Sequence, residues 1–61
     1  MKILKLEDAE EVLTIYINAE HIEAVFKNHR KLTRINMSSG EFHTVEQSVE
    51  TVVKLMGEVS P

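Results

Sequence analysis

The sequence predicts an α+β fold in which a four- to five-stranded antiparallel sheet, connected as a meander, is followed by one C-terminal amphipathic helix packed on one face. Three observations predict this fold. Short segments rich in β-branched and aromatic side chains alternate with polar breaks over residues 2–43. Apolar residues then recur with a helical period over residues 45–56. The chain has 61 residues, which is enough for a single domain spanning residues 1–61.

The predicted strands follow one another with short polar breaks between them. They span residues 2–7, 12–17, 21–27, 32–37 and 41–43. The second is the clearest, because β-branched and aromatic side chains fill nearly all of it. Gly40 lies between the last two strands and suits a hairpin turn, because glycine readily adopts the positive φ that such turns require.

The helix prediction rests on periodicity and on capping residues. The apolar positions recur at i, i+4, i+7, i+8 and i+11, which is one face of a helix; they are Val45, Val49, Val52, Val53 and Met56. Thr44 followed by Gln47 has the spacing of a capping box, and Gly57 lies where a helix commonly ends. Leu55 and Val59 fall off this stripe, so they are either incidental or part of a wider contact surface.

Alternation along the strands separates a core face from an outward face. The predicted core face, covered by the helix, holds Leu4, Leu6, Leu13, Ile15, Ile17, Ile22, Ala24, Phe26, Ile35, Met37 and Phe42. The outward face holds five apolar residues that form a possible interface: Ile3, Val12, Tyr16, Val25 and Leu32. This outward face is more apolar than solvent exposure requires, which predicts a protein partner.

Small size also favours association. A domain this short buries only about 60% of the surface of its unfolded chain, so its core is marginal. The usual supports are disulfides, a structural metal or a second subunit. The chain has no cysteine, which excludes disulfides and thiolate zinc sites. We therefore expect a homo-oligomer or a complex with another protein.

Charge is distributed in blocks. Residues 1–23 hold six acidic and two basic residues, and residues 24–34 hold four basic and no acidic ones. The basic residues form a possible nucleic-acid contact; they are Lys27, Arg30, Lys31 and Arg34. The alternative is a solvated hairpin tip. The alternative is favoured by the net charge of −3 and by the lack of a predicted row of exposed aromatic side chains on which bases could stack. In a simple meander, the loops at residues 8–11 and 27–31 emerge at the same end, so acid and base can pair within or between subunits.

No pattern of residues predicts catalysis, a metal site, a cofactor or a small-molecule substrate. The histidines His21, His29 and His43 lie on separate elements, and only fortunate strand pairing would bring two of them together with Glu41. We interpret them as half-exposed polar positions. The serines of the residue 38–40 turn have no neighbouring base, and a domain this small encloses a ligand cleft with difficulty. We expect that the protein is not an enzyme.

The N-terminal residues alternate between charged and apolar, unlike the uninterrupted apolar stretch of a signal peptide. No segment reaches the roughly 20 apolar residues that a membrane span needs. We therefore expect a cytoplasmic protein without membrane insertion.

Two segments carry a resemblance to a known family. Residues 17–23 (INAEHIE) and residues 40–53 (GEFHTVEQSVETVV) resemble the FlbD family of small bacterial flagellar and swarming-motility proteins, in the same order along the chain. The resemblance implies a non-enzymatic accessory protein that acts through contacts, and it transfers no catalytic residue. The leading hypothesis is a self-associating interaction protein, and the resemblance implies a role in motility. The alternatives are a small nucleic-acid-binding regulatory protein that uses residues 27–34, and a phage or other bacterial protein of the same fold.

Overall fold

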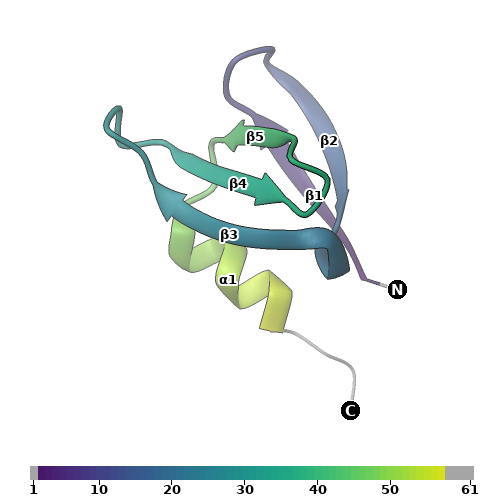
Figure 1. Ribbon diagram of the computed structural model, residues 1–61. Coiled ribbons are helices and arrows are strands. Elements are labelled where there is room, and N and C mark those ends of the chain that lie inside the picture. The colour runs from purple at the N-terminus through teal and green to yellow at the C-terminus, as the bar shows by residue number, and fades with distance from the viewer. Residues whose placement is uncertain (1, 58–61) are drawn as a thin grey trace.

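The computed structural model describes residues 2–57 and has five strands and one helix in that part of the chain (Figure 1). A short 3₁₀ turn, η1 (Ala19–His21), connects the second and third strands. The elements are β1 (Ile3–Asp8), β2 (Leu13–Asn18), β3 (Ile22–Lys27), β4 (Thr33–Met37), β5 (Phe42–Val45) and α1 (Val49–Gly57). All strand pairs are antiparallel, and the helix packs beside β3. The predicted α+β class is confirmed.

The strand order divides the sheet into two halves. It runs β2-β1-β5-β4-β3, so β5 lies between β1 and β4 and only β3, β4 and β5 form a continuous meander. The halves join at one register position, Asp8 opposite Val45. Two hydrogen bonds flank this junction: Ala9 N–H donates to the Thr44 carbonyl at 2.8 Å and Glu46 N–H donates to the Glu7 carbonyl at 2.9 Å. The β1–β2 hairpin therefore runs across the back of the meander, as Figure 1 shows.

The core lies between the two halves of the sheet and the helix. Both halves and α1 contribute buried side chains, which are Leu4, Leu6, Ile17, Ile35, Met37, Val45 and Val52. The β1–β2 register places Leu4 opposite Ile17 and Leu6 opposite Ile15, so the inner face of this hairpin is apolar over these two pairs. The core is therefore covered by α1 and also by the packing of the two halves of the sheet against each other.

The alternation predicted for β3 is wrong because this strand contains a β-bulge. Ile22 pairs with Met37 but Ala24 pairs with Asn36, so Glu23 is an extra residue in the ladder. A shift by one residue moves all later side chains to the opposite face. Val25 therefore packs against the core, and Phe26, predicted to be buried, lies opposite Arg34 and is 41% exposed.

Two other residues of the predicted core are also exposed. Phe42 is 52% exposed, because it pairs with Asn36 on the face of the meander that points away from Ile35. Leu13 is 45% exposed at the far end of the β1–β2 hairpin. Ala24 is half-buried and shares the outward register position of Asn36.

The helix begins later than predicted, at Val49 rather than at residue 45. Thr44 and Val45 remain in β5, and the backbone on either side of Val45 is engaged in the hydrogen bonds to β1. Ser48 forms the cap instead: its Oγ accepts from Thr51 N–H at 3.1 Å, and its carbonyl accepts from Val52 N–H at 3.0 Å. The predicted capping box at residues 44 and 47 is therefore wrong.

The later start also changes which helix residues face the core. Val52 is fully buried, and Leu55 and Met56 pack against the core at i+3 and i+4. Val53, predicted on the buried stripe, is 52% exposed. Leu55 is thus a packing residue, while Val59 lies outside the described residues.

Candidate functional site

Two loops meet at one end of the molecule, and each is held by an acceptor side chain. Asp8 Oδ1 accepts from the backbone N–H groups of Glu10 at 2.8 Å and Glu11 at 2.9 Å, which orders the β1–β2 loop. The N–H of Glu11 and that of Glu10 hold the pKa of Asp8 below its ordinary value, and the charge of His43 acts in the same direction.

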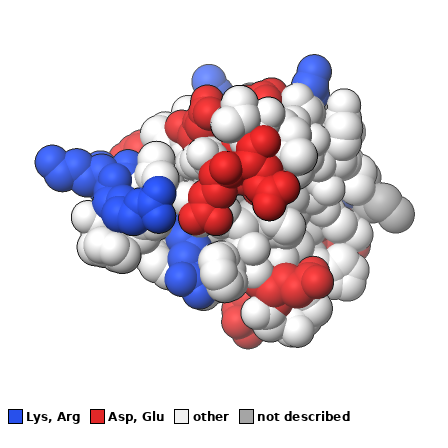
Figure 2. All heavy atoms as spheres, turned by 90° about the horizontal axis from the view of Figure 1, so that it is seen from above, with Lys and Arg blue, Asp and Glu red and all other residues white. Residues whose placement is uncertain are grey.

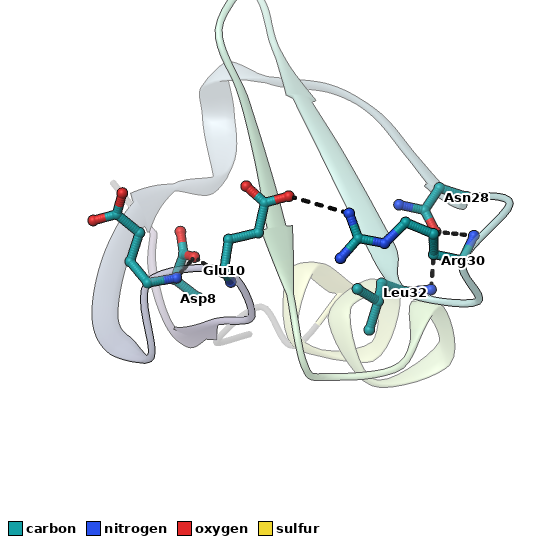
Figure 3. Close-up of polar contacts among 6 residues, drawn as sticks. Asp8, Glu10, Asn28, Arg30 and Leu32 are labelled. Atoms are coloured by element: carbon teal, nitrogen blue, oxygen red, sulfur yellow. Dashed lines mark hydrogen bonds and ion pairs between the residues drawn. The ribbon is translucent and has the colours of Figure 1, made fainter.

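The β3–β4 loop uses the same device. Asn28 Oδ1 accepts from Arg30 N–H at 2.9 Å and from Leu32 N–H at 3.0 Å. Lys31 lies between Arg30 and Leu32 and has a positive φ of 64°. The hydrogen bonds from Arg30 and Leu32 to Asn28 support this conformation. Figure 3 shows Arg30 directed out of this loop toward Glu10.

An ion pair joins the two loops. Arg30 Nη1 lies 3.7 Å from Glu10 Oε2, and the two side chains are 57% and 52% exposed. The prediction that these loops emerge at one end and pair is confirmed within one chain, although the sheet order is not sequential. Figure 2 shows basic side chains gathered at one end, directly beside a group of acidic ones. An exposed pair of this kind contributes about 0–1 kcal/mol, so it orients the loops more than it stabilises the fold.

An arginine lies among aromatic rings on the outward face of the meander. The Arg34 guanidinium carbon is 3.9 Å from the Phe42 ring centroid and 5.9 Å from that of Phe26. Arg34 Nε donates to Asn36 Oδ1 at 3.0 Å, which helps to fix the guanidinium plane. We call Phe26, Arg34, Asn36 and Phe42 the aromatic–arginine cluster. The sequence does not predict this cluster, because alternation along the strands places both phenylalanines in the core.

The outward surface of the β1–β2 hairpin is a second candidate. Ile3 is 48% exposed and Tyr16 is 68% exposed, and the register places both side chains on the face opposite Leu4 and Leu6. Beside them, Thr14 Oγ1 donates to the Glu7 carboxylate at 3.1 Å. At the tip of the hairpin, Val12 is 81% exposed and has φ of 51°, which is unusual for a β-branched residue.

The structure therefore divides the predicted site residues between several places. Of the five interface residues, Ile3, Val12 and Tyr16 are exposed, Val25 packs against the core, and Leu32 is half-buried in the β3–β4 loop. The four basic residues are close in sequence and lie on one hairpin. Lys27 ends β3, Arg30 and Lys31 lie in its loop, and Arg34 lies in β4.

Within residues 2–57, no group of three or more histidine and carboxylate side chains is placed to hold a metal ion. None of the helices in that same range is long and apolar enough to cross a membrane. Comparison with known proteins adds no relative: no family model, curated protein or solved structure matches this chain. We therefore infer the function of this chain from its own surfaces.

Proposed function

We propose that this protein is a small non-enzymatic interaction module that associates with a second copy of itself along the free edge of β2. The observation that carries this proposal is the chemistry of that edge. β2 is the outermost strand on its side of the sheet, and its six residues include no charge and no proline. Its register with β1 is continuous, so no bulge distorts it. Such an edge presents backbone N–H and C=O groups on which another strand can pair.

The opposite edge of the sheet differs in each of these respects. β3 contains the bulge at Glu23 and ends at Lys27. The helix α1 also packs beside it. Charges, bulges and covering helices are the devices by which proteins prevent edge-to-edge pairing. The contrast within one sheet supports β2 as the edge that pairs.

The side chains around β2 support the same proposal. Tyr16 and Ile3 offer apolar area on the outward face of the hairpin. Aromatic residues are enriched at protein interfaces, where they bury large areas at low entropic cost. The described residues include seven buried apolar side chains, a small core that leaves a small stability margin, which association would increase. The resemblance to the FlbD family suggests that the module serves motility as an accessory protein.

Sedimentation equilibrium of the wild-type chain and of a Tyr16→Lys variant tests this proposal. Tyr16 is exposed, so a lysine there places a charge at the edge without disturbing the monomer's core. The matched control is Val53→Lys, which adds the same charge at an exposed position on α1. We expect the wild type and the control to form dimers and Tyr16→Lys to be monomeric. A wild-type chain that stays monomeric, with a melting temperature independent of concentration, would contradict the proposal.

A further inference from the structure

We propose that the aromatic–arginine cluster, together with the basic β3–β4 loop, binds single-stranded nucleic acid. This function is separate from self-association through β2, because it uses the other half of the sheet. The bulge in β3 is what makes it possible, since it turns Phe26 outward next to Arg34.

The cluster provides a stacking surface for bases. Phe42 is 52% exposed and Phe26 is 41% exposed, and both lie on the outward face of a three-stranded meander. Arg34 between them is half-buried and is oriented by its hydrogen bond to Asn36. Unpaired bases stack on aromatic rings and on arginine planes, whereas the bases of a duplex are not available for such stacking.

The loop next to the cluster provides the cations for the phosphates. Lys27 follows Phe26 directly at the end of β3, and Lys31 lies in the loop that leads into β4, the strand of Arg34. Residues 24–34 contain no acidic residue, so the hairpin is locally cationic although the chain has a net charge of −3. A cationic loop beside a stacking surface is the arrangement that recognises a flexible strand carrying both bases and phosphates.

The Glu10 carboxylate competes with the phosphates for Arg30. Their separation is 3.7 Å and both side chains are about half exposed, so water and ligand can reach the pair. Three cations then remain for phosphates: Lys27, Lys31 and Arg34. With a slope of about −0.7 per phosphate contact on a single strand, affinity should fall about 20-fold between about 50 mM and about 200 mM salt. If Glu10 is neutralised, a fourth contact becomes available and the fall becomes about 50-fold.

Fluorescence anisotropy of labelled oligo(U) and oligo(dT), each about 12 nucleotides long, tests the proposal with the full chain. We expect binding at low salt that weakens about 20-fold over the stated range, and weaker binding to duplex DNA of the same length. Glu10→Gln should bind more tightly than the wild type and show the steeper salt dependence. Heparin serves as a polyanion without bases.

Substitutions separate stacking from charge. Phe42→Ala should weaken oligonucleotide binding at least fivefold and leave heparin binding unchanged, because stacking contributes about 1–3 kcal/mol per base. Arg34→Lys keeps the positive charge but removes the planar guanidinium group on which a base can stack. It should therefore also weaken oligonucleotide binding more than heparin binding. Val53→Ala is the matched control, since Val53 is also 52% exposed, and it should bind as the wild type does. The melting temperature of each variant shows whether it is folded. If Phe42→Ala is unfolded, Phe42→Leu is used in its place.

Several outcomes would overturn the proposal. One is absence of binding to both oligonucleotides at low salt. A second is equal affinity for single strands, duplex and heparin. A third is that folded Phe42 and Arg34 variants keep full affinity, which would mean that the cluster takes no part in recognition.

Discussion

Two neighbouring valines on α1 provide a matched test of how the helix packs. Val52 is fully buried in the core cluster, whereas Val53 is 52% exposed. Both lie in the interior of the same nine-residue helix, so a Val→Ala substitution changes helix propensity equally at the two sites. The difference between the two variants therefore reports packing alone.

The expected magnitude follows from burial. Val52→Ala removes about 1.6 kcal/mol of transfer free energy, at about 0.8 kcal/mol for each of the two carbons lost. A residual cavity of about 30 Å³ adds about 0.7 kcal/mol. Alanine's better helix propensity returns about 0.5 kcal/mol, so the net loss is about 2 kcal/mol. For Val53→Ala, half of the transfer free energy, no cavity and the same gain in helix propensity leave a loss of about 0.3 kcal/mol.

Urea unfolding followed by circular dichroism measures both variants. A domain of this length has a free energy of unfolding of about 3–9 kcal/mol, so Val52→Ala should lower the midpoint substantially and Val53→Ala should hardly move it. If association contributes to stability, both variants must be measured at the same protein concentration. Equal losses at the two positions would refute the packing of α1 described here.

Three further perturbations concern the turns and caps. Val12→Asn should raise the free energy of unfolding by about 1 kcal/mol in urea titrations, because asparagine tolerates the positive φ that a β-branched residue resists; an unchanged or lower value would contradict the strain at this position. Ser48→Ala should lower the free energy of unfolding by about 1 kcal/mol through loss of the cap, and a helix signal that melts as in the wild type would count against this cap. Asp8 has a pKa below its ordinary value of 3.8, so its stabilising effect is present above that value and is lost as pH falls through the lowered pKa. The urea midpoint of Asp8→Asn should therefore lie below that of the wild type at neutral pH and approach it in acid, and a pH-independent gap would exclude Asp8 as the titrating group.

The sequence predicts the secondary-structure classes of this protein because its local signals are strong. The β-branched run in β2 and the glycine of the β4–β5 turn indicate strands and a hairpin without reference to the rest of the chain. Gly40 indeed has φ of 96°. The charge blocks also indicate Glu10 and Arg30 as partners, but the expectation that their loops meet rests on a sequential meander, and the observed strand order is β2-β1-β5-β4-β3.

Non-local pairing explains what the sequence does not predict. The bulge at Glu23 depends on how β3 aligns with β4, and that alignment decides whether Phe26 or Val25 is buried. Likewise, Val45 fits the period of the helix, but the hydrogen bonds around it to β1 keep it in a strand. Alternation alone cannot detect either event, because each is set by residues distant in sequence.

The candidate site was partly predictable for the same reasons. The basic residues of the β3–β4 hairpin are visible as a charge block, and Ile3 and Tyr16 follow from simple alternation. The aromatic–arginine cluster requires the register of three strands, since Phe26, Arg34 and Phe42 come from β3, β4 and β5. The most informative pair in the sequence is Arg34 and Ile35, because one is charged and the next is apolar. This pair indicates which face of β4 is buried, and the strand pairing then gives the buried faces of β3 and β5.

Hydrogen exchange of the backbone amides at several protein concentrations tests most directly the claim that the free edge of β2 binds a second copy. If it does, those amides of β2 that point away from β1 should become more protected as concentration rises, while the amides at the free edge of β3 should not change. Tyr16→Lys should remove the concentration dependence. Protection of β2 that is independent of concentration, or that rises at β3 instead, would contradict the claim.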